Sequence, residues 1–252
     1  MLIFRAKGVV FMKVLSIGNS FSEDAQAYLH KLALECGLEI DSVNLFIGGC
    51  SLETHYNNIK ENKVAYMVEE NGVRTEKWAS ISSALDNENY DIITLQQASP
   101  SSGMPQTYIP YLVEIYNFVK EKQPNAKIYF HQTWAYEQGT ERYPYYNNDQ
   151  HEMYRRIVDA SEMASKLINA PIIPCGTVIQ KLRDTIEEFD YINGGISLCR
   201  DGKHISLDYG RFALSATWIK CLTGKNIVID GFEDFDKNLI NKILKVVNEF
   251  EY

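Results

Sequence analysis

Short apolar segments rich in strand-forming residues alternate along this chain with longer segments whose apolar residues recur at helical spacing. The strand-like segments cover residues 14–17, 40–47, 92–95, 128–130 and 172–173. After the third of them, Tyr108, Leu112, Ile115 and Val119 fall at i, i+4, i+7 and i+11, which places them on one face of a helix. Such alternation is typical of an α/β fold, in which helices cover both faces of a mostly parallel sheet.

One segment departs from this alternation. Residues 63–78 contain two β-prone runs separated by Asn71-Gly72, and this dipeptide is the strongest short-range signal for a hairpin turn. The sequence therefore predicts an antiparallel β-hairpin on the surface, inserted into an otherwise doubly wound domain.

Composition bounds the class of protein. The chain has 252 residues, of which 45% are hydrophobic and 23% charged, as in an ordinary globular protein. We expect one domain over residues 13–252 after an N-terminal extension over residues 1–12, so that Met1 and Met12 are both candidate starts. The five cysteines are scattered without C-x-x-C spacing, and no pair of histidines has metal-ligand spacing. We therefore predict reduced thiols, no metal and no cofactor.

Charge narrows the range of partners. The net charge is -8 and no run is rich in Lys and Arg, which argues against binding to nucleic acids or anionic membranes. No apolar run reaches the ~18 residues that a membrane span requires. We expect a cytoplasmic protein that acts on an uncharged small molecule, and the sequence leaves its oligomeric state open.

A serine stands where the first strand-like segment ends and a helical segment begins. The residues Gly18-Asn19-Ser20-Phe21-Ser22 directly follow that strand. An α/β sheet collects its ligands beyond the carboxyl ends of its strands, and a serine on a sharp strand-to-helix turn exposes its hydroxyl there. Ser20 is therefore the candidate nucleophile.

A candidate base lies near the other end of the chain. In Asp201-Gly202-Lys203-His204, the carboxylate can reach back to Nδ1–H of the histidine. Nε2 of His204 is then free to accept the proton of a serine. The sequence therefore supplies a base together with the group that orients it.

Two further segments offer hydrogen-bond donors for an oxyanion. Gly48-Gly49 follows the second strand-like segment, where a backbone N–H can approach a reacting carbonyl without a side chain in the way. Gln96-Gln97 ends the third strand-like segment, where a side-chain amide can supply another donor.

Taken in this order, the four segments resemble the SGNH hydrolase superfamily, the GDSL-type esterases and lipases, over residues 13 to about 222. The resemblance implies a flavodoxin-like fold with a five-stranded parallel sheet of strand order 2-1-3-4-5. It also implies that Ser20 is the nucleophile, that Asp201 and His204 complete a triad, and that the N–H groups of Ser20 and Gly49 bind the oxyanion.

The chain departs from the family pattern at two places. Asn19 stands where the first motif usually has an aspartate, and Gln96-Gln97 replace the usual G-x-N-D, whose asparagine is an oxyanion donor. We take Gln97 as the corresponding donor and keep Gln96 as the alternative, because the register is open by one residue.

The resemblance implies a serine esterase for short-acyl esters, and the glutamine pair favours O-acetyl groups on carbohydrates. Candidate substrate contacts are His55, His131, Gln132 and Trp134. The alternatives are that His131 forms a hydrogen bond with a neighbouring loop and that His55 lies on the plain surface. The loop over residues 133–149 adds four aromatics, whose rings either hold a sugar or acyl group or pack over the sheet edge: Tyr136, Tyr143, Tyr145 and Tyr146. Alternatives are a non-catalytic carbohydrate- or ligand-binding relative, a lysophospholipase or thioesterase, and an acyltransferase.

Overall fold

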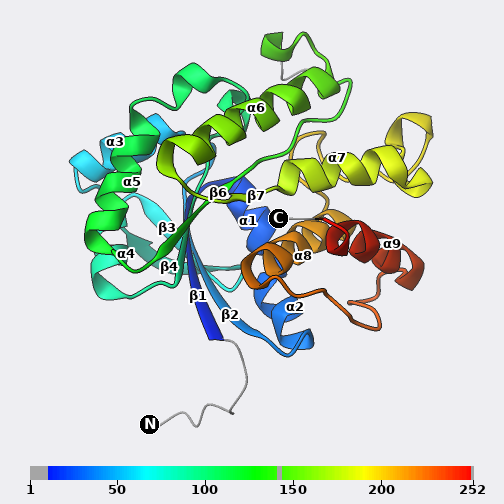
Figure 1. Ribbon diagram of the computed structural model, residues 1–252, viewed down its shortest axis with the longest axis horizontal. Coiled ribbons are helices and arrows are strands. Elements are labelled where there is room, and N and C mark those ends of the chain that lie inside the picture. The colour runs from blue at the N-terminus through cyan, green and yellow to red at the C-terminus, as the bar shows by residue number, and fades with distance from the viewer. Residues whose placement is uncertain (1–10, 141–143, 251–252) are drawn as a thin grey trace.

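The computed structural model describes residues 11–140 and 144–250 and shows an α/β fold built on a seven-stranded sheet (Figure 1). The strands lie in the order β4-β3-β2-β1-β5-β6-β7. Their bounds are β1 Phe11–Gly18, β2 Glu39–Phe46, β3 Tyr66–Glu70, β4 Val73–Ala79, β5 Ile92–Leu95, β6 Lys127–His131 and β7 Ile172–Ile173.

The strands β2, β1, β5, β6 and β7 are parallel to their neighbours in this part of the sheet, and each overlaps one of the strand-like segments of the sequence. Their carboxyl ends therefore meet at one edge of the sheet, the edge at which α/β proteins bind ligands. The loops that follow β1, β2 and β5 carry the residues singled out by their motifs.

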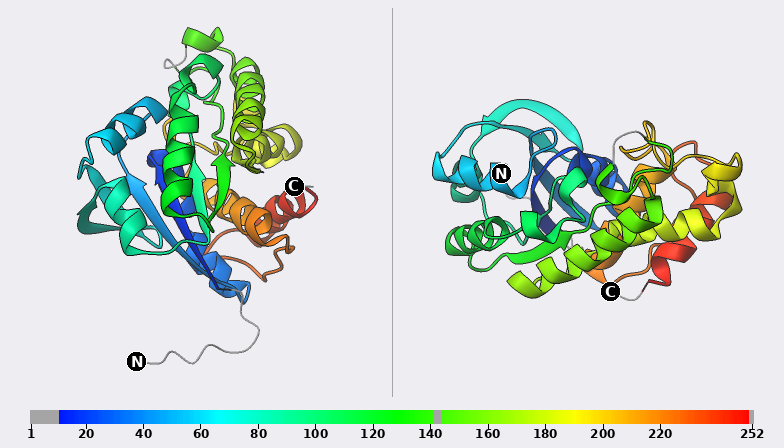
Figure 2. Two further views of the ribbon diagram at one scale, coloured as in Figure 1. Left: turned by 60° about the vertical axis from the view of Figure 1, so that its left-hand side comes forward. Right: turned by 90° about the horizontal axis from the view of Figure 1, so that it is seen from above.

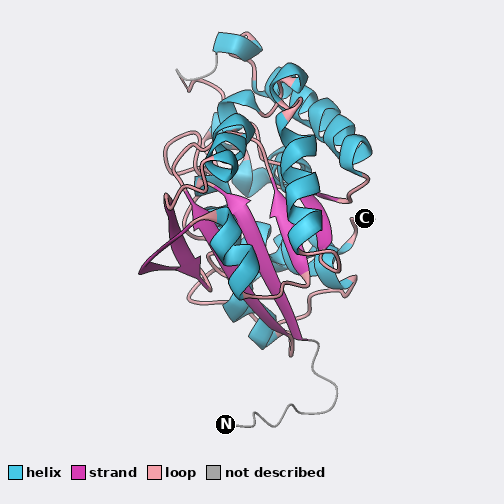
Figure 3. Ribbon diagram, turned by 90° about the vertical axis from the view of Figure 1, so that its left-hand side faces the viewer, coloured by secondary structure: helices cyan, strands magenta, loops and turns pink. Residues whose placement is uncertain are grey.

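The predicted hairpin is present but continues the sheet. Asn71 and Gly72 have φ values of 52° and 77°, as a type I′ turn requires at both central residues. We expected a surface excursion from a five-stranded sheet, whereas β3 pairs antiparallel with β2 and extends the sheet to seven strands (Figure 3). This pairing satisfies the outer backbone groups of β2, and β4 becomes the edge strand.

The helices follow the strands in the alternating pattern that the sequence predicts. Their bounds are α1 Ser20–Gln26, α2 Leu29–Glu35, α3 Leu52–Lys60, α4 Ile81–Asn87, α5 Tyr111–Lys122, α6 Gln150–Ile168, α7 Cys175–Thr185, α8 Tyr209–Thr223 and α9 Lys237–Asn248. Short 3₁₀ turns cover Ser99–Ser101, Pro105–Thr107, Pro144–Tyr146, Glu187–Phe189 and Tyr191–Asn193. None of the described helices is long and apolar enough to cross a membrane.

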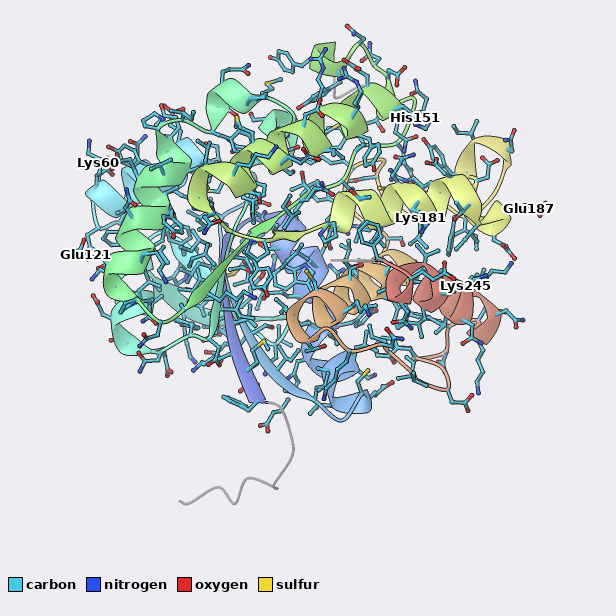
Figure 4. The ribbon with its side chains drawn as sticks, viewed as in Figure 1. Lys60, Glu121, His151, Lys181, Glu187 and Lys245 are labelled. Atoms are coloured by element: carbon cyan, nitrogen blue, oxygen red, sulfur yellow. The ribbon has the colours of Figure 1, made fainter. Side chains whose placement is uncertain are left out.

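Two hydrophobic cores lie on opposite faces of the sheet. Residues of α1, α2, α7, α8 and α9 build one core, and residues of α3, α4 and α5 build the other (Figures 1 and 2). Helix α6 contributes to both, with Met153 in the first core and Ala164 in the second. Charged residues such as Lys60 and Glu121 lie on the outer sides of the helices, as Figure 4 shows.

Candidate active site

Ser20 is the first residue of α1 and follows the carboxyl end of β1 after a single linking residue. That residue, Asn19, is the N-cap: its Oδ1 accepts a hydrogen bond from Phe21 N at 3.0 Å, and Ser22 Oγ accepts one from Asn19 N at 3.0 Å. The preceding position favours glycine, because a Cβ on Gly18 would lie 1.9 Å from Ser22 Oγ and would displace this hydroxyl from its hydrogen bond with Asn19 N. The turn that presents Ser20 is thus fixed by its immediate neighbours.

The structure brings Ser20, His204 and Asp201 together. His204 Nε2 lies 3.1 Å from Ser20 Oγ, and His204 Nδ1 lies 2.7 Å from Asp201 Oδ2. Asp201 Oδ1 also accepts the backbone N–H groups of Lys203, at 3.0 Å, and His204, at 2.7 Å. Desolvation alone would raise the pKa of Asp201, but these hydrogen bonds outweigh it and lower that pKa to about 2. Asp201 is therefore ionised at neutral pH and fixes the tautomer in which His204 Nδ1 carries the proton.

A buried tryptophan supports both segments of this constellation. Trp134 Nε1 donates a hydrogen bond to Lys203 O at 2.8 Å, which holds the loop that carries His204. The ring of Trp134 also stacks on Phe21, the neighbour of Ser20, with ring centroids 4.1 Å apart. Trp134 itself is fully buried, so it acts as a support rather than as a surface for a ligand.

A second link between the two segments is ionic. Asp24 lies one turn after Ser20 on α1 and is fully buried. Its carboxylate accepts hydrogen bonds from Arg200 NH1 at 3.0 Å and from Arg211 Nε at 2.9 Å. The backbone N–H of Arg200 in turn donates to His204 O at 2.9 Å. Asp24 therefore ties the helix of the serine to the loop of the histidine.

The glycine loop lies against Asn19. Asn19 Nδ2 donates a hydrogen bond to Cys50 O at 3.0 Å, and Gly49 has a φ of 65°, a conformation that glycine adopts without strain. Burial raises the pKa of Cys50 to about 12, so Cys50 is a neutral thiol rather than a nucleophile. The loop after β2 is thus held at the N-terminus of α1, beside Ser20.

The two glutamines have different environments, and Gln97, the predicted oxyanion donor, is held by contacts within the fold. Its Nε2 donates to Thr107 O and Thr107 Oγ1, both at 3.0 Å, and its Oε1 accepts from Leu52 N at 3.0 Å. The amide hydrogens of Gln97 are therefore used within the loop after β5, and its Oε1 joins this loop to the start of α3 after β2. Gln97 has no hydrogen left for a substrate oxygen.

Gln96, the alternative, lies next to the serine loop. Its Nε2 donates to Asn19 Oδ1 at 2.6 Å, which leaves one amide hydrogen, and its Oε1 lies 2.8 Å from His131 Nδ1. Burial lowers the pKa of His131 to about 3, so this imidazole is neutral and donates its Nδ1 proton to Gln96. His131 thereby sets the orientation of the Gln96 amide.

The remaining predicted substrate contacts are buried. His55, His131 and Trp134 are fully buried, and Gln132 is 3% exposed. His55 lies 2.9 Å from the hydroxyl of Tyr66 through Nδ1, and Gln132 Oε1 accepts from Thr177 N at 2.8 Å. The hydrogen bonds of these side chains that the structure describes are made within the fold, whereas Nε2 of His55 and of His131 has no partner there.

The aromatic loop is mostly internal as well. Tyr136 and Tyr146 are buried, Tyr145 is exposed, and Tyr143 lies outside the described residues. Tyr146 OH accepts from Gly103 N and donates to Pro100 O, both at 3.0 Å, so its ring anchors the loop after β5. The loop packs its own aromatics over the sheet, which was the second of the two predicted alternatives.

Sequence reasoning missed the residues that hold the site together. Asp24 and Arg200 are 176 residues apart, and no local spacing connects them. For His131 the sequence leaves two roles open, a substrate contact or a hydrogen bond to a neighbouring loop, and it does not identify Gln96 as the partner. Asn19 was noticed as a departure from the family pattern, and this departure was the available signal, since an amide at that position both donates and accepts.

Comparisons with known proteins agree with this architecture. The family model described as "Domain of unknown function (DUF4886)" matches residues 13–242. The crystal structure of a DUF4886 family protein from Bacteroides uniformis is 37% identical, with a TM-score of 0.86 over 94% of this chain and 93% of that one. No curated protein matches the chain.

Two more distant structures share the fold. A candidate SGNH hydrolase from Slackia heliotrinireducens has a TM-score of 0.59 at 19% identity, over 84% of this chain and 99% of that one. An acetylxylan esterase from Geobacillus stearothermophilus has a TM-score of 0.54 at 13% identity, over 86% of this chain and 97% of that one. The fold is thus that of SGNH hydrolases.

Proposed function

The chain belongs to the DUF4886 family, and we propose that it is a serine esterase whose nucleophile is Ser20. One observation carries this proposal: the continuous chain of contacts from Ser20 Oγ to His204 Nε2, at 3.1 Å, and from His204 Nδ1 to Asp201 Oδ2, at 2.7 Å. A base within hydrogen-bond reach of a hydroxyl, itself oriented by a carboxylate, is the arrangement that activates a serine.

In the proposed mechanism, His204 Nε2 removes the proton of Ser20 as Oγ forms a bond to the ester carbonyl carbon. The carbonyl π electrons move to oxygen, and the resulting oxyanion collapses to expel the alcohol, which takes the proton from Nε2. A water molecule then gives a proton to Nε2 and attacks the acyl-enzyme, and collapse of this second oxyanion releases the acid and returns the proton to Ser20. Asp201 stabilises the imidazolium in both halves of the reaction.

We assign the oxyanion to the backbone N–H groups of Ser20 and Gly49 and to the amide of Gln96. The N–H of Ser20 belongs to the first turn of α1, where backbone donors have no partner within the helix. Gln96 replaces Gln97 in this role, because its Nε2 keeps a hydrogen beyond the one given to Asn19. Asn19 supports this assignment, because it contacts both the glycine loop, through Cys50 O, and Gln96.

The proposed substrates are short-acyl esters, with O-acetyl groups on carbohydrates as the first class to test. The shared fold with an acetylxylan esterase supports this choice. The net charge of -8 further favours an uncharged substrate over an anionic one.

Labelling with a fluorophosphonate, followed by mass spectrometry of the modified peptide, tests the nucleophile. We expect the wild-type protein to be modified at Ser20 and Ser20→Ala to remain unmodified. Ser82→Ala is the matched control, because Ser82 lies on α4 and its hydroxyl donates to Asp86 of the same helix, and it should label like the wild type.

Hydrolysis of acetyl esters by the same three proteins completes the experiment. Loss of the nucleophile should remove most turnover, as in other serine hydrolases. If Ser20→Ala hydrolyses acetyl esters as fast as the wild type, the assignment of the nucleophile is wrong. If the wild type neither labels nor turns over, the protein is a non-catalytic binding relative with the same fold.

A further inference from the structure

Three large apolar side chains form a row across the outer part of the sheet and belong to neither hydrophobic core. Phe46 of β2 is paired with Met67 of β3, and Met67 is paired with Trp78 of β4. Residues directly opposite each other in antiparallel strands share a face of the sheet. Phe46 and Met67 are half-buried, whereas Trp78 is 62% exposed, although tryptophan is usually well buried.

The inner end of this row lies beside the candidate active site. Phe46 is paired in register with Gly18, two residues before Ser20, and a Cβ on Gly48 would lie 3.9 Å from Phe46 Cζ. Four strands separated by ~4.8 Å place Cα of Trp78 roughly 14 Å from Cα of Gly18. The row therefore leads from the glycine loop to the edge of the sheet, at the end where the parallel strands point.

We propose that Phe46, Met67 and Trp78 form a binding platform for the part of the substrate that extends beyond the reacting ester, and that this part is an oligosaccharide. The proposal rests on the esterase function proposed above. The carbon-bound hydrogens of a sugar ring form a flat apolar face that packs on an indole ring, which offers a large contact area at a low cost in conformational entropy.

A cationic side chain completes the platform. The guanidinium carbon of Arg74 lies 4.9 Å from the centroid of the Phe46 ring, and the Arg74 side chain is 55% exposed. Its Nε and Nη2 donate to Glu23 Oε1, at 2.9 Å and 2.5 Å, so the donors that it offers to sugar hydroxyls are the N–H groups of Nη1. The platform thus combines apolar faces with polar donors at its side, as in sites that bind uncharged polar ligands.

The features of β4 argue against a second copy of this chain as the occupant of the row. The register of β4 with β3 shifts between Met67 and Glu69, as at a β-bulge. Arg74, Glu76 and Lys77 are exposed along it. Bulged and charged edge strands are those that avoid pairing with another molecule.

Intrinsic fluorescence isolates the platform, because Trp78 is the exposed one of the three tryptophans while Trp134 and Trp218 are fully buried. We would titrate Ser20→Ala with O-acetylated oligosaccharides of xylose, glucose, mannose and N-acetylglucosamine. At least one of them should change the emission saturably and protect it from quenching by acrylamide. Because this variant cannot turn over substrate by the proposed route, the titration judges the platform independently of the esterase mechanism.

Kinetics give the second readout. For Trp78→Ala we expect the ratio of kcat/KM for the bound oligosaccharide to kcat/KM for ethyl acetate to fall about tenfold through KM, which corresponds to ~1.4 kcal/mol. Val73→Ala is the matched control, since Val73 is exposed on the same strand at its other end, and it should keep the wild-type ratio.

Two outcomes would overturn the platform. One is an unchanged emission and an unchanged ratio for every oligosaccharide of the panel. The other is a dimer in analytical ultracentrifugation that shields Trp78 from acrylamide without ligand. Failure of the esterase proposal gives a separate result, since the rate of ethyl acetate hydrolysis would then be the same for Ser20→Ala and the wild type.

Discussion

Replacing Asn19 with the aspartate that SGNH hydrolases usually have before their serine should lower the stability of this protein and slow its turnover. Asn19 makes three hydrogen bonds with its amide: it accepts from Phe21 N and Gln96 Nε2 and donates to Cys50 O. Asn19→Asp preserves both acceptor interactions and removes the donor. A carboxylate oxygen then faces the carbonyl oxygen of Cys50 at about the present 3.0 Å, in a site where Asn19 is 1% exposed.

The size of the effect follows from these contacts. Leaving a buried acceptor unsatisfied costs ~1–3 kcal/mol. A negative charge at the N-terminus of α1 returns ~0.3–1 kcal/mol. The net loss in free energy of unfolding is about 1–2 kcal/mol, which lowers Tm by roughly 2–8 °C for a chain of this size. Because the same bond holds the loop of Gly49, kcat should fall about tenfold, less than the ~10²–10³ that loss of a whole oxyanion donor costs.

The pH dependence identifies the cause. Burial against a carbonyl oxygen favours the protonated carboxyl, so the pKa of the introduced aspartate in the folded variant is raised above its unfolded value of ~3.9. The protonated form can donate to Cys50 O, and its stabilisation is lost as pH rises through that raised pKa. The Tm deficit of Asn19→Asp relative to the wild type should therefore be smaller at low pH than at high pH. Asn19→Ala, which cannot titrate, should show a deficit that does not change with pH.

Thermal unfolding by circular dichroism at several pH values measures the Tm deficit and its pH dependence. Acetyl-ester kinetics at neutral pH measure kcat. Equal Tm and equal kcat for Asn19→Asp and the wild type above neutral pH would refute the reasoning. So would a deficit that grows as pH falls.

Two further predictions concern charged groups around α1. Asp24→Asn leaves the guanidinium groups of Arg200 and Arg211 without their buried partner. The free energy of unfolding, measured by urea titration, should fall by ~3 kcal/mol. A loss below ~1 kcal/mol would show that Asp24 does not hold α1 and the loop of His204 together. Burial raises the pKa of Glu69 to about 7 despite the nearby Arg74. The protonated form of Glu69 therefore stabilises the fold fully below its unfolded pKa of ~4.3, and this stabilisation is lost as pH rises through 7. Glu69→Gln should remove that decline from the pH profile of urea unfolding, and an unchanged slope would contradict the raised pKa.

Several features of the fold follow from local sequence because their causes are local. The alternation of strand-like and helical segments predicts parallel strands joined by helices, since each amphipathic helix must bury its stripe against the sheet. The Asn71-Gly72 turn predicts the hairpin, because both residues tolerate positive φ. The spacing of Asp201 and His204 predicts that their side chains form a hydrogen bond, because a tight turn brings residues i and i+3 close together.

Other features depend on contacts between distant segments. Which glutamine faces Asn19 follows from the alternation of side chains at the end of β5, where a shift of one residue reverses the face. The same packing buries His55, His131 and Trp134, which are polar or amphipathic and were predicted to contact substrate. A histidine or tryptophan near a strand end has no local signal that distinguishes a support from a ligand contact.

The sequence by itself determined that Ser20 begins a helix after the first strand. It also determined that His204, with Asp201 to orient it, lies near the other end of the chain. Only the tertiary structure decided that Ser20 and His204, 184 residues apart, meet at 3.1 Å. It also decided that Trp134, Asp24 and Arg200 hold them there. The reason is physical: backbone turns and caps are set by neighbouring residues, whereas the approach of two loops is set by the packing of the helices and strands that carry them.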